Sequence, residues 1–147
     1  MKKLLTIEHK SVSIDIALLI ARVAIAAFML VHGLPKMEKL FSGEPVAFAN
    51  IFGMGQELSL GLAVFAEVIC SVFILLGLGT RLAVIPLIIT MLVAVFYIHG
   101  ADPFVKQEMG LHYLIVYVML LIMGSGRYSV DNYLFANTRR NYATLLS

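Results

Sequence analysis

The chain has 147 residues, of which 61% are hydrophobic and 14% are charged, whereas soluble domains average roughly 45–50% apolar and about 25% charged residues. A chain this short has too little interior to hide so much apolar surface from water, so a soluble globular protein is excluded and the lipid bilayer is the expected partner. The net charge of +2 is small and the basic residues are scattered, which gives no support for nucleic-acid binding.

The apolar runs are continuous rather than alternating, which indicates helices and not a transmembrane β-barrel. At roughly 20 residues per span, about four helices fit the chain. The sequence therefore predicts an all-α membrane protein, a single membrane domain built as a four-transmembrane-helix bundle. The expected spans are about 14–31, 58–78, 82–98 and 103–123.

The first span should end or kink at His32-Gly33-Leu34-Pro35, because proline interrupts a helix. A cleavable signal peptide is the alternative for this N-terminal region. Arg22 would then lie inside the apolar part of the signal, which argues against cleavage.

Three segments between and after the spans carry local signals. Residues 46–52 are apolar but too short to cross, which favours an interfacial or re-entrant segment. Asp102-Pro103 predicts a helix start, with aspartate as the N-cap and proline at the first helical position. The C-terminal segment, 131–147, is expected to be a short surface helix at the membrane or a disordered tail.

The distribution of basic residues predicts the orientation. Only Lys36, Lys39 and Lys106 fall on one face of the expected bundle, whereas the other basic residues fall on the face that holds both termini and the 79–81 turn. Since cytoplasmic loops carry the excess of Lys and Arg, both termini are expected to be cytoplasmic.

Three ionisable residues lie at membrane depth and are the candidate catalytic residues. Counted at 1.5 Å per residue, Arg22 lies about 12 Å deep, and Glu67 and His112 each lie about 18 Å deep. An unpaired charge there costs roughly 2.5–3.5 kcal/mol even on a lenient scale, so Arg22 and Glu67 are expected to pair. The pair either locks the bundle or, with His112, forms an acid–base set that moves protons.

Cys70 is the only cysteine, so no disulfide within the chain and no CxxC motif can form. It lies one turn from Glu67, and a buried thiol usually behaves as a small hydrophobic group.

A second polar group is expected at the extracytoplasmic ends of the spans. His32, Lys36, Tyr97 and His99 are the candidate cofactor-binding residues there, with Asp102 nearby, and they could form a polar mouth to the interior. No HxH or HxxxH spacing is present, so no metal site is predicted.

Several segments together resemble the DoxX family of small four-helix membrane proteins. They are the His32-Gly33-x-x-Lys36 pattern after an Arg-bearing helix, Glu67 in a helix that ends Gly77-Leu78-Gly79-Thr80-Arg81, His99-Gly100-Ala101-Asp102-Pro103, and Gly124-Ser125-Gly126-Arg127. The resemblance covers about residues 17–131. Many relatives carry glutamate where this chain has His112, so a carboxylate pair with Glu67 is not implied here.

The resemblance implies a multi-pass protein of a bacterial-type cytoplasmic (inner) membrane. It also implies a role as a redox subunit linked to quinone and to sulfur or thiol oxidation, or as part of an oxidative-stress complex. A quinone cofactor is then expected near Arg22, Glu67 and His112. The sequence has no Fe–S, haem-attachment or dinucleotide motif, so electrons would come from a redox partner protein or a small reductant.

Two other functions remain open from the sequence. The first is a non-catalytic membrane scaffold that recruits partner proteins, in which the Arg22–Glu67 pair is structural. The second is a small transporter or proton path, although four short spans without repeated halves make a poor carrier. The alanines at 17, 21 and 24 permit close helix packing within one chain or in an oligomer.

Overall fold

The computed structural model describes residues 11–134, and every regular element within them is helical. Four helical stretches are long and apolar enough to cross a membrane, namely Val12–Phe41, Gln56–Leu76, Thr80–Ile98 and Phe104–Met123. The prediction of an all-α membrane bundle with four spans is therefore confirmed.

Two of the spans contain a π-helical segment, which the sequence pattern did not reveal. The second span consists of α3 (Gln56–Val64), the π-helix η2 (Phe65–Cys70) and α4 (Ser71–Leu76). The third consists of α5 (Thr80–Leu92) and the π-helix η3 (Val93–Ile98). The first span is α2 (Ser11–Phe41), the fourth is α6 (Phe104–Met123), and η1 (Ile51–Gly53) is a single 3₁₀ turn.

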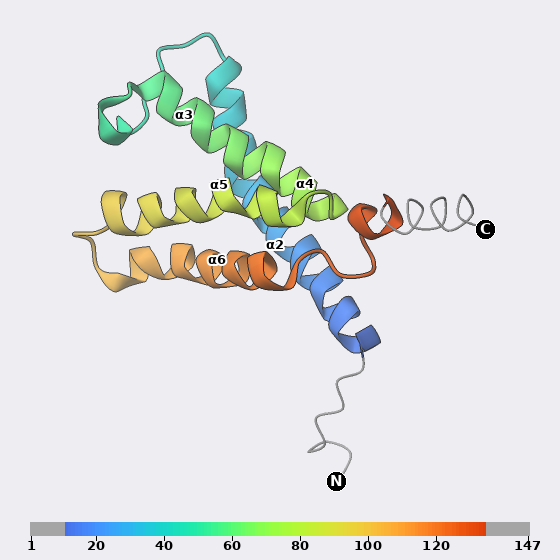
Figure 1. Ribbon diagram of the computed structural model, residues 1–147. Helices are drawn as coiled ribbons and strands as arrows, with labels where there is room; N and C mark the ends of the chain where they lie inside the picture. The colour runs from blue at the N-terminus through green and yellow to red at the C-terminus, as the bar shows by residue number, and fades with distance from the viewer. Residues whose placement is uncertain (1–10, 135–147) are drawn as a thin grey trace.

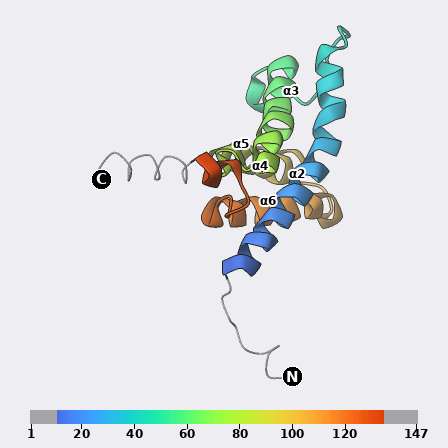
Figure 2. The same cartoon turned by 90° about the vertical axis from the view of Figure 1, so that its right-hand side faces the viewer.

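The four spans form two pairs that cross each other. Helices α5 and α6 lie side by side as an antiparallel hairpin, and α2 runs obliquely across them (Figure 1). The view turned by 90° shows α2 and α3 side by side (Figure 2). The first two spans therefore diverge from the hairpin at one end of the bundle, and the candidate site lies between them and α5.

The core lies where the four spans meet. Ala26, Val84, Leu87 and Leu120 have no exposed surface and come from three different spans. Large apolar side chains also cover the outside of every span, as the 75% exposure of Leu82 illustrates. An apolar exterior around helices that satisfy their own backbone groups is the arrangement that a bilayer requires.

The first helix was predicted to end or kink at His32–Pro35, and it does not end there. Helix α2 contains Pro35 and continues to Phe41, which gives it a length of about 46 Å, more than the hydrocarbon thickness of about 30 Å. A proline inside a helix costs about 3 kcal/mol. Contacts beyond it offset this cost, because Met37 and Leu40 pack against buried residues of the second span.

The predicted N-cap role of Asp102 is also wrong. Helix α6 begins at Phe104, with Pro103 in the N-cap position and no side-chain cap. The Asp102 carboxylate instead binds His99, because both residues belong to the same short turn.

The segment that connects α2 to α3 contains little regular structure. Residues 42–50 form no helix, and η1 is the single helical turn between them and α3. Residues 130–134 form a helical turn, and the rest of the expected C-terminal tail lies outside the described residues.

Candidate functional site

Glu67 lies in the π-helix η2 and is only 2% exposed. One of its carboxylate oxygens, Oε1, lies 2.5 Å from Nζ of Lys36 on α2. A buried carboxylate needs such a partner, and π-helical turns are frequent at functional sites. The interior charge is therefore neutralised by Lys36, a residue that the sequence placed in the outer group.

Gly33 allows the two spans to approach closely enough for this pair. A Cβ atom at Gly33 would lie 2.8 Å from Cγ2 of Val68 and 3.0 Å from the backbone of Glu67. Lys36 follows three residues later, so it lies close to the face of α2 that meets η2. The spacing between Gly33 and Lys36 was the sequence signal that could have identified the true partner of Glu67.

The predicted contact between Arg22 and Glu67 is wrong. Arg22 is completely buried, and its guanidinium donates to the carbonyl oxygen of Ile74 at 3.3 Å and to that of Tyr128. The negative charge of Asp131 also attracts the guanidinium. Ile74 lies seven residues beyond Glu67, about 10 Å along the helix, so the guanidinium extends toward the opposite end of the bundle.

Gly77 provides the space for this guanidinium. It ends α4 with φ 70°, and a Cβ atom there would overlap Nη1 of Arg22. Arg22 therefore joins the first span, the end of the second and the segment that follows α6. The depth counted along the sequence indicates that Arg22 needs a partner, but it cannot give the direction of the side chain.

The prediction that His112 joins the interior cluster is also wrong. His112 is exposed on the outside of the bundle, whereas its neighbours Tyr113 and Tyr117 on α6 are buried. The two tyrosine rings stack with their centroids 6.1 Å apart. Their four-residue spacing on an apolar helix was the signal that could have identified them as the inward-facing polar residues.

Two cavities meet at the Lys36–Glu67 pair. The first has a volume of about 350 Å³ and is mostly apolar, with Phe48, Phe52, Leu62, Val93 and Ile98 among its lining residues. The second has a volume of about 170 Å³ and is lined by His32, Tyr113 and Lys106, among others. Lys36, Glu67, Ala94 and His99 line both.

Three of the four residues predicted for the outer group therefore line a cavity together with Glu67. Lys36 and His99 line both cavities, and His32 lines the smaller one with its ring edge-on to Tyr113. Tyr97 lines neither cavity, although its ring packs against Phe52 of the larger one with centroids 4.7 Å apart.

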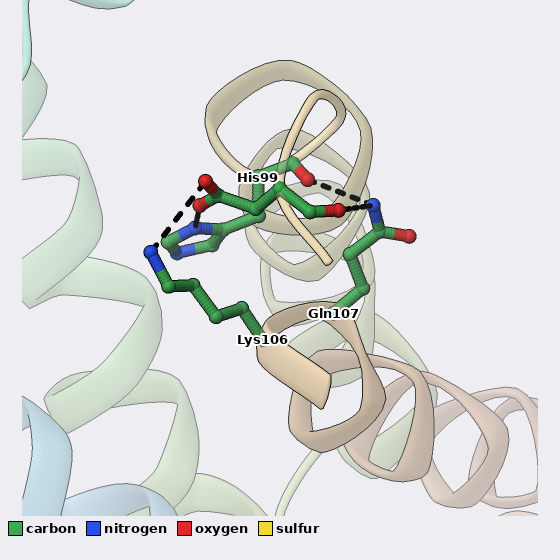
Figure 3. A network of polar contacts seen from close by, with 4 residues as sticks. His99, Lys106 and Gln107 are labelled. Atoms are coloured by element: carbon green, nitrogen blue, oxygen red, sulfur yellow. Dashed lines mark hydrogen bonds and ion pairs between the residues drawn. The ribbon is translucent and has the colours of Figure 1, made fainter. Parts of the chain in front are cut away.

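His99 belongs to a polar network at the turn between α5 and α6 (Figure 3). Its Nδ1 atom lies 2.7 Å from Oδ2 of Asp102, and Nζ of Lys106 lies 3.5 Å from the other carboxylate oxygen. The hydrogen bond from His99 and the charge of Lys106 lower the pKa of Asp102 below its ordinary value. Asp102 is therefore ionised at neutral pH.

A larger hollow, of about 840 Å³, lies at the opposite end of the bundle and is lined by residues of the 79–82 and 123–126 segments. It does not contain the buried pair. Among residues 11–134 no three His, Cys, Asp or Glu side chains group as metal ligands would. The two cavities at Lys36 and Glu67 are therefore the candidate site, and they combine an apolar wall with an ion pair and an imidazole.

The comparisons with known proteins give one match. Residues 17–100, more than half of the chain, match the sequence model of the DoxX family. The matched stretch includes α2 from residue 17 onward, the second span and the third span, and so contains Lys36, Glu67 and His99. No match was found among curated proteins or among solved structures.

Proposed function

The chain belongs to the DoxX family, and on that premise we propose that it is the membrane subunit of a quinone-linked oxidoreductase system. The quinone head group would bind in the cavities beside Lys36 and Glu67. The protein would work in a bacterial-type cytoplasmic membrane with both termini on the cytoplasmic side. It is a multi-pass membrane protein, so its substrate would reach the site through lipid.

The buried ion pair at the wall of an apolar cavity carries this proposal. Lys36 and Glu67 are 2.5 Å apart, and both line a cavity of about 350 Å³. Ligand sites typically combine a mostly apolar wall with a few polar groups, in volumes of roughly 300–1,000 Å³. A pair needed only to lock two helices would require no cavity beside it.

The residues present fit a quinone. The apolar lining suits a substituted ring, and the Lys36 ammonium can donate to a ring carbonyl oxygen, which accepts hydrogen bonds only. Atom Oε2 of Glu67 is buried and has no hydrogen-bond partner among the described residues. A carboxylate with an unused acceptor is suited to a ligand that can also present a hydroxyl group.

A bound quinone would supply the capacity to take up two electrons and two protons. Lys36 would orient the head group, and Glu67 would hold Lys36 charged. The apolar wall would exclude water from the ring. The chain contains a single cysteine and no cofactor-binding motif, so the electrons would come from a separate partner protein or a small reductant.

Mass spectrometry of quinone retained in lipid nanodiscs tests the proposal. The wild type should retain quinone above empty discs, and Lys36→Met and Glu67→Gln should each reduce the retained amount severalfold. Lys39→Met is the matched control, because Lys39 lies on the same helix and donates to the carbonyl of Ala47 instead. Retention by the control shows that loss of an outer lysine is not itself the cause.

The alternative function is a non-catalytic scaffold, in which the Lys36–Glu67 pair only stabilises the bundle. It predicts no quinone above the empty-disc level in the wild type and a loss of stability in both variants. That result would refute the quinone site and would make partner proteins the next subject of study.

A further inference from the structure

His99 is held in one orientation by groups outside its own ring. It follows η3 directly, and Nε2 of Gln107 donates to the carbonyl of His99 at 2.8 Å and to that of Asp102 at 3.2 Å (Figure 3). The turn is thus fixed from α6, and His99 lines both cavities. The imidazole is therefore presented to the candidate site by a supported backbone.

The contact with Asp102 determines which ring nitrogen carries the proton. A carboxylate only accepts hydrogen bonds, so Nδ1, at 2.7 Å from Oδ2, must be the donor. In neutral imidazole the other nitrogen, Nε2, is then an acceptor. Among residues 11–134, Nε2 has no hydrogen-bond partner.

The site consequently offers a donor and two acceptors that are not fully used. Lys36 supplies the donor, and the acceptors are Nε2 of His99 and the unpartnered Oε2 of Glu67. A quinone ring can use only the donor, because its two carbonyl oxygens cannot donate. A hydroquinone ring, with hydroxyl groups in their place, can use both kinds.

We infer that His99 accepts the hydrogen bond of a ligand hydroxyl group, so that the site binds the hydroquinone form in preference to the quinone form. Asp102 is the positioning residue that keeps Nε2 free to accept. The inference rests on the proposed quinone site and adds the substrate form that the site favours.

Other charged and titratable groups line the smaller cavity together with His99. Lys36 and His32 come from α2, Glu67 from η2, and Lys106 and Tyr113 from α6. Lys36 is paired with Glu67, and Lys106 is close to Asp102, so each lysine has a carboxylate partner. His99 is the imidazole whose second nitrogen remains without a partner beside both cavities.

The probes are a short-chain hydroquinone, its dimethyl ether and the corresponding quinone, titrated anaerobically into nanodiscs with empty discs subtracted. The hydroquinone should bind about five- to tenfold more tightly than either the quinone or the ether, as expected for one net hydrogen bond.

Variants separate His99 from the other histidines. His99→Phe should remove most of the preference, because phenylalanine has no acceptor, and the matched control His112→Phe should keep it, since the His112 side chain is exposed. Asp102→Asn should weaken the preference, because the two neutral tautomers of His99 then mix and Nε2 is no longer always the acceptor. Asp102→Glu should restore it at least in part.

Nitrogen-15 NMR of the histidine side chains gives a readout that needs no ligand. Wild-type His99, assigned by its loss in His99→Phe, should carry its neutral-form proton on Nδ1, and Asp102→Asn should mix the two tautomers. An Nε2-protonated neutral form in the wild type would overturn the inference.

Binding outcomes separate the inference from the proposed function. Equal affinities for the hydroquinone, the quinone and the ether would overturn the role of His99 while leaving the quinone site intact. Absence of binding by all three probes would overturn the proposed function and the inference with it.

Discussion

Removal of the Lys36 ammonium tests whether the buried Glu67 carboxylate needs it as a partner for the bundle to be stable. At the observed separation of 2.5 Å, the Coulomb attraction is about 7 kcal/mol with an effective dielectric constant of about 20. Most of this attraction is offset by the cost of desolvating the two groups, and the loss of one partner of a buried pair costs roughly 3–5 kcal/mol. Since the Lys36 side chain is 33% exposed, we expect Lys36→Met to lower the free energy of unfolding by about 2–4 kcal/mol.

The reverse substitution should be milder. Glu67→Gln leaves the Lys36 ammonium unpaired, but a long side chain that is already partly exposed can reach water. We expect Glu67→Gln to lower the free energy of unfolding by about 1–2 kcal/mol. The double variant should lose less than the sum of the two single losses, by about 1.5 kcal/mol or more.

The assay is reversible unfolding in mixed micelles, followed by circular dichroism. It is applied to the wild type, the two single variants and the double variant, which together form a double-mutant cycle. Lys39→Met is the matched control and should cost less than about 0.5 kcal/mol, because Lys39 makes only an exposed contact. A coupling energy below about 0.5 kcal/mol between Lys36 and Glu67 would refute the pairing. A large coupling between Arg22 and Glu67 would instead restore the contact suggested by the sequence.

The remaining predictions concern the rest of the bundle. Gly33→Ala should destabilise by about 1–3 kcal/mol, because its Cβ would meet Val68 at 2.8 Å, whereas Gly61→Ala, with nothing within 4 Å, should be neutral or slightly stabilising in the same unfolding assay; equal effects would contradict the close approach. Arg22→Met should cost about 1–3 kcal/mol and should speed limited trypsin cleavage after Arg127, because the guanidinium no longer binds the carbonyl of Tyr128, yet quinone retention should be unchanged. The lowered pKa of Asp102 means that its contribution to stability is complete above the ordinary value of 3.8 and is lost as the pH falls through the lower folded value, so the stability difference between wild type and Asp102→Asn should shrink below about pH 4; a difference that grows there would contradict the His99–Asp102 bond. In a Cys70→Ala background, Ala101→Cys should react with an impermeant maleimide from outside the cell and Ser125→Cys only after permeabilisation, and the opposite pattern would reverse the expected orientation.

The sequence determined the solvent and the architecture. Apolar runs of about 20 residues leave few alternatives in a bilayer, because every backbone group must be satisfied within its own helix. The same logic identified Arg22 and Glu67 as residues that need partners, since an isolated charge at that depth is costly. The sequence also placed Lys36 and His99 together in a polar group at one end of the spans.

Only the tertiary structure decided which group is the partner of each buried charge. Depth is counted along one helix, but a contact depends on the rotation of two helices about their axes and on how closely they approach. Continuation of α2 through Pro35 and the absence of a side chain at Gly33 bring Lys36 to Glu67, while the π-helix η2 changes the rotation of the second span. Arg22 and His112 face elsewhere for the same reason, since rotation and approach follow from packing over the whole bundle and not from the spacing of residues in one span.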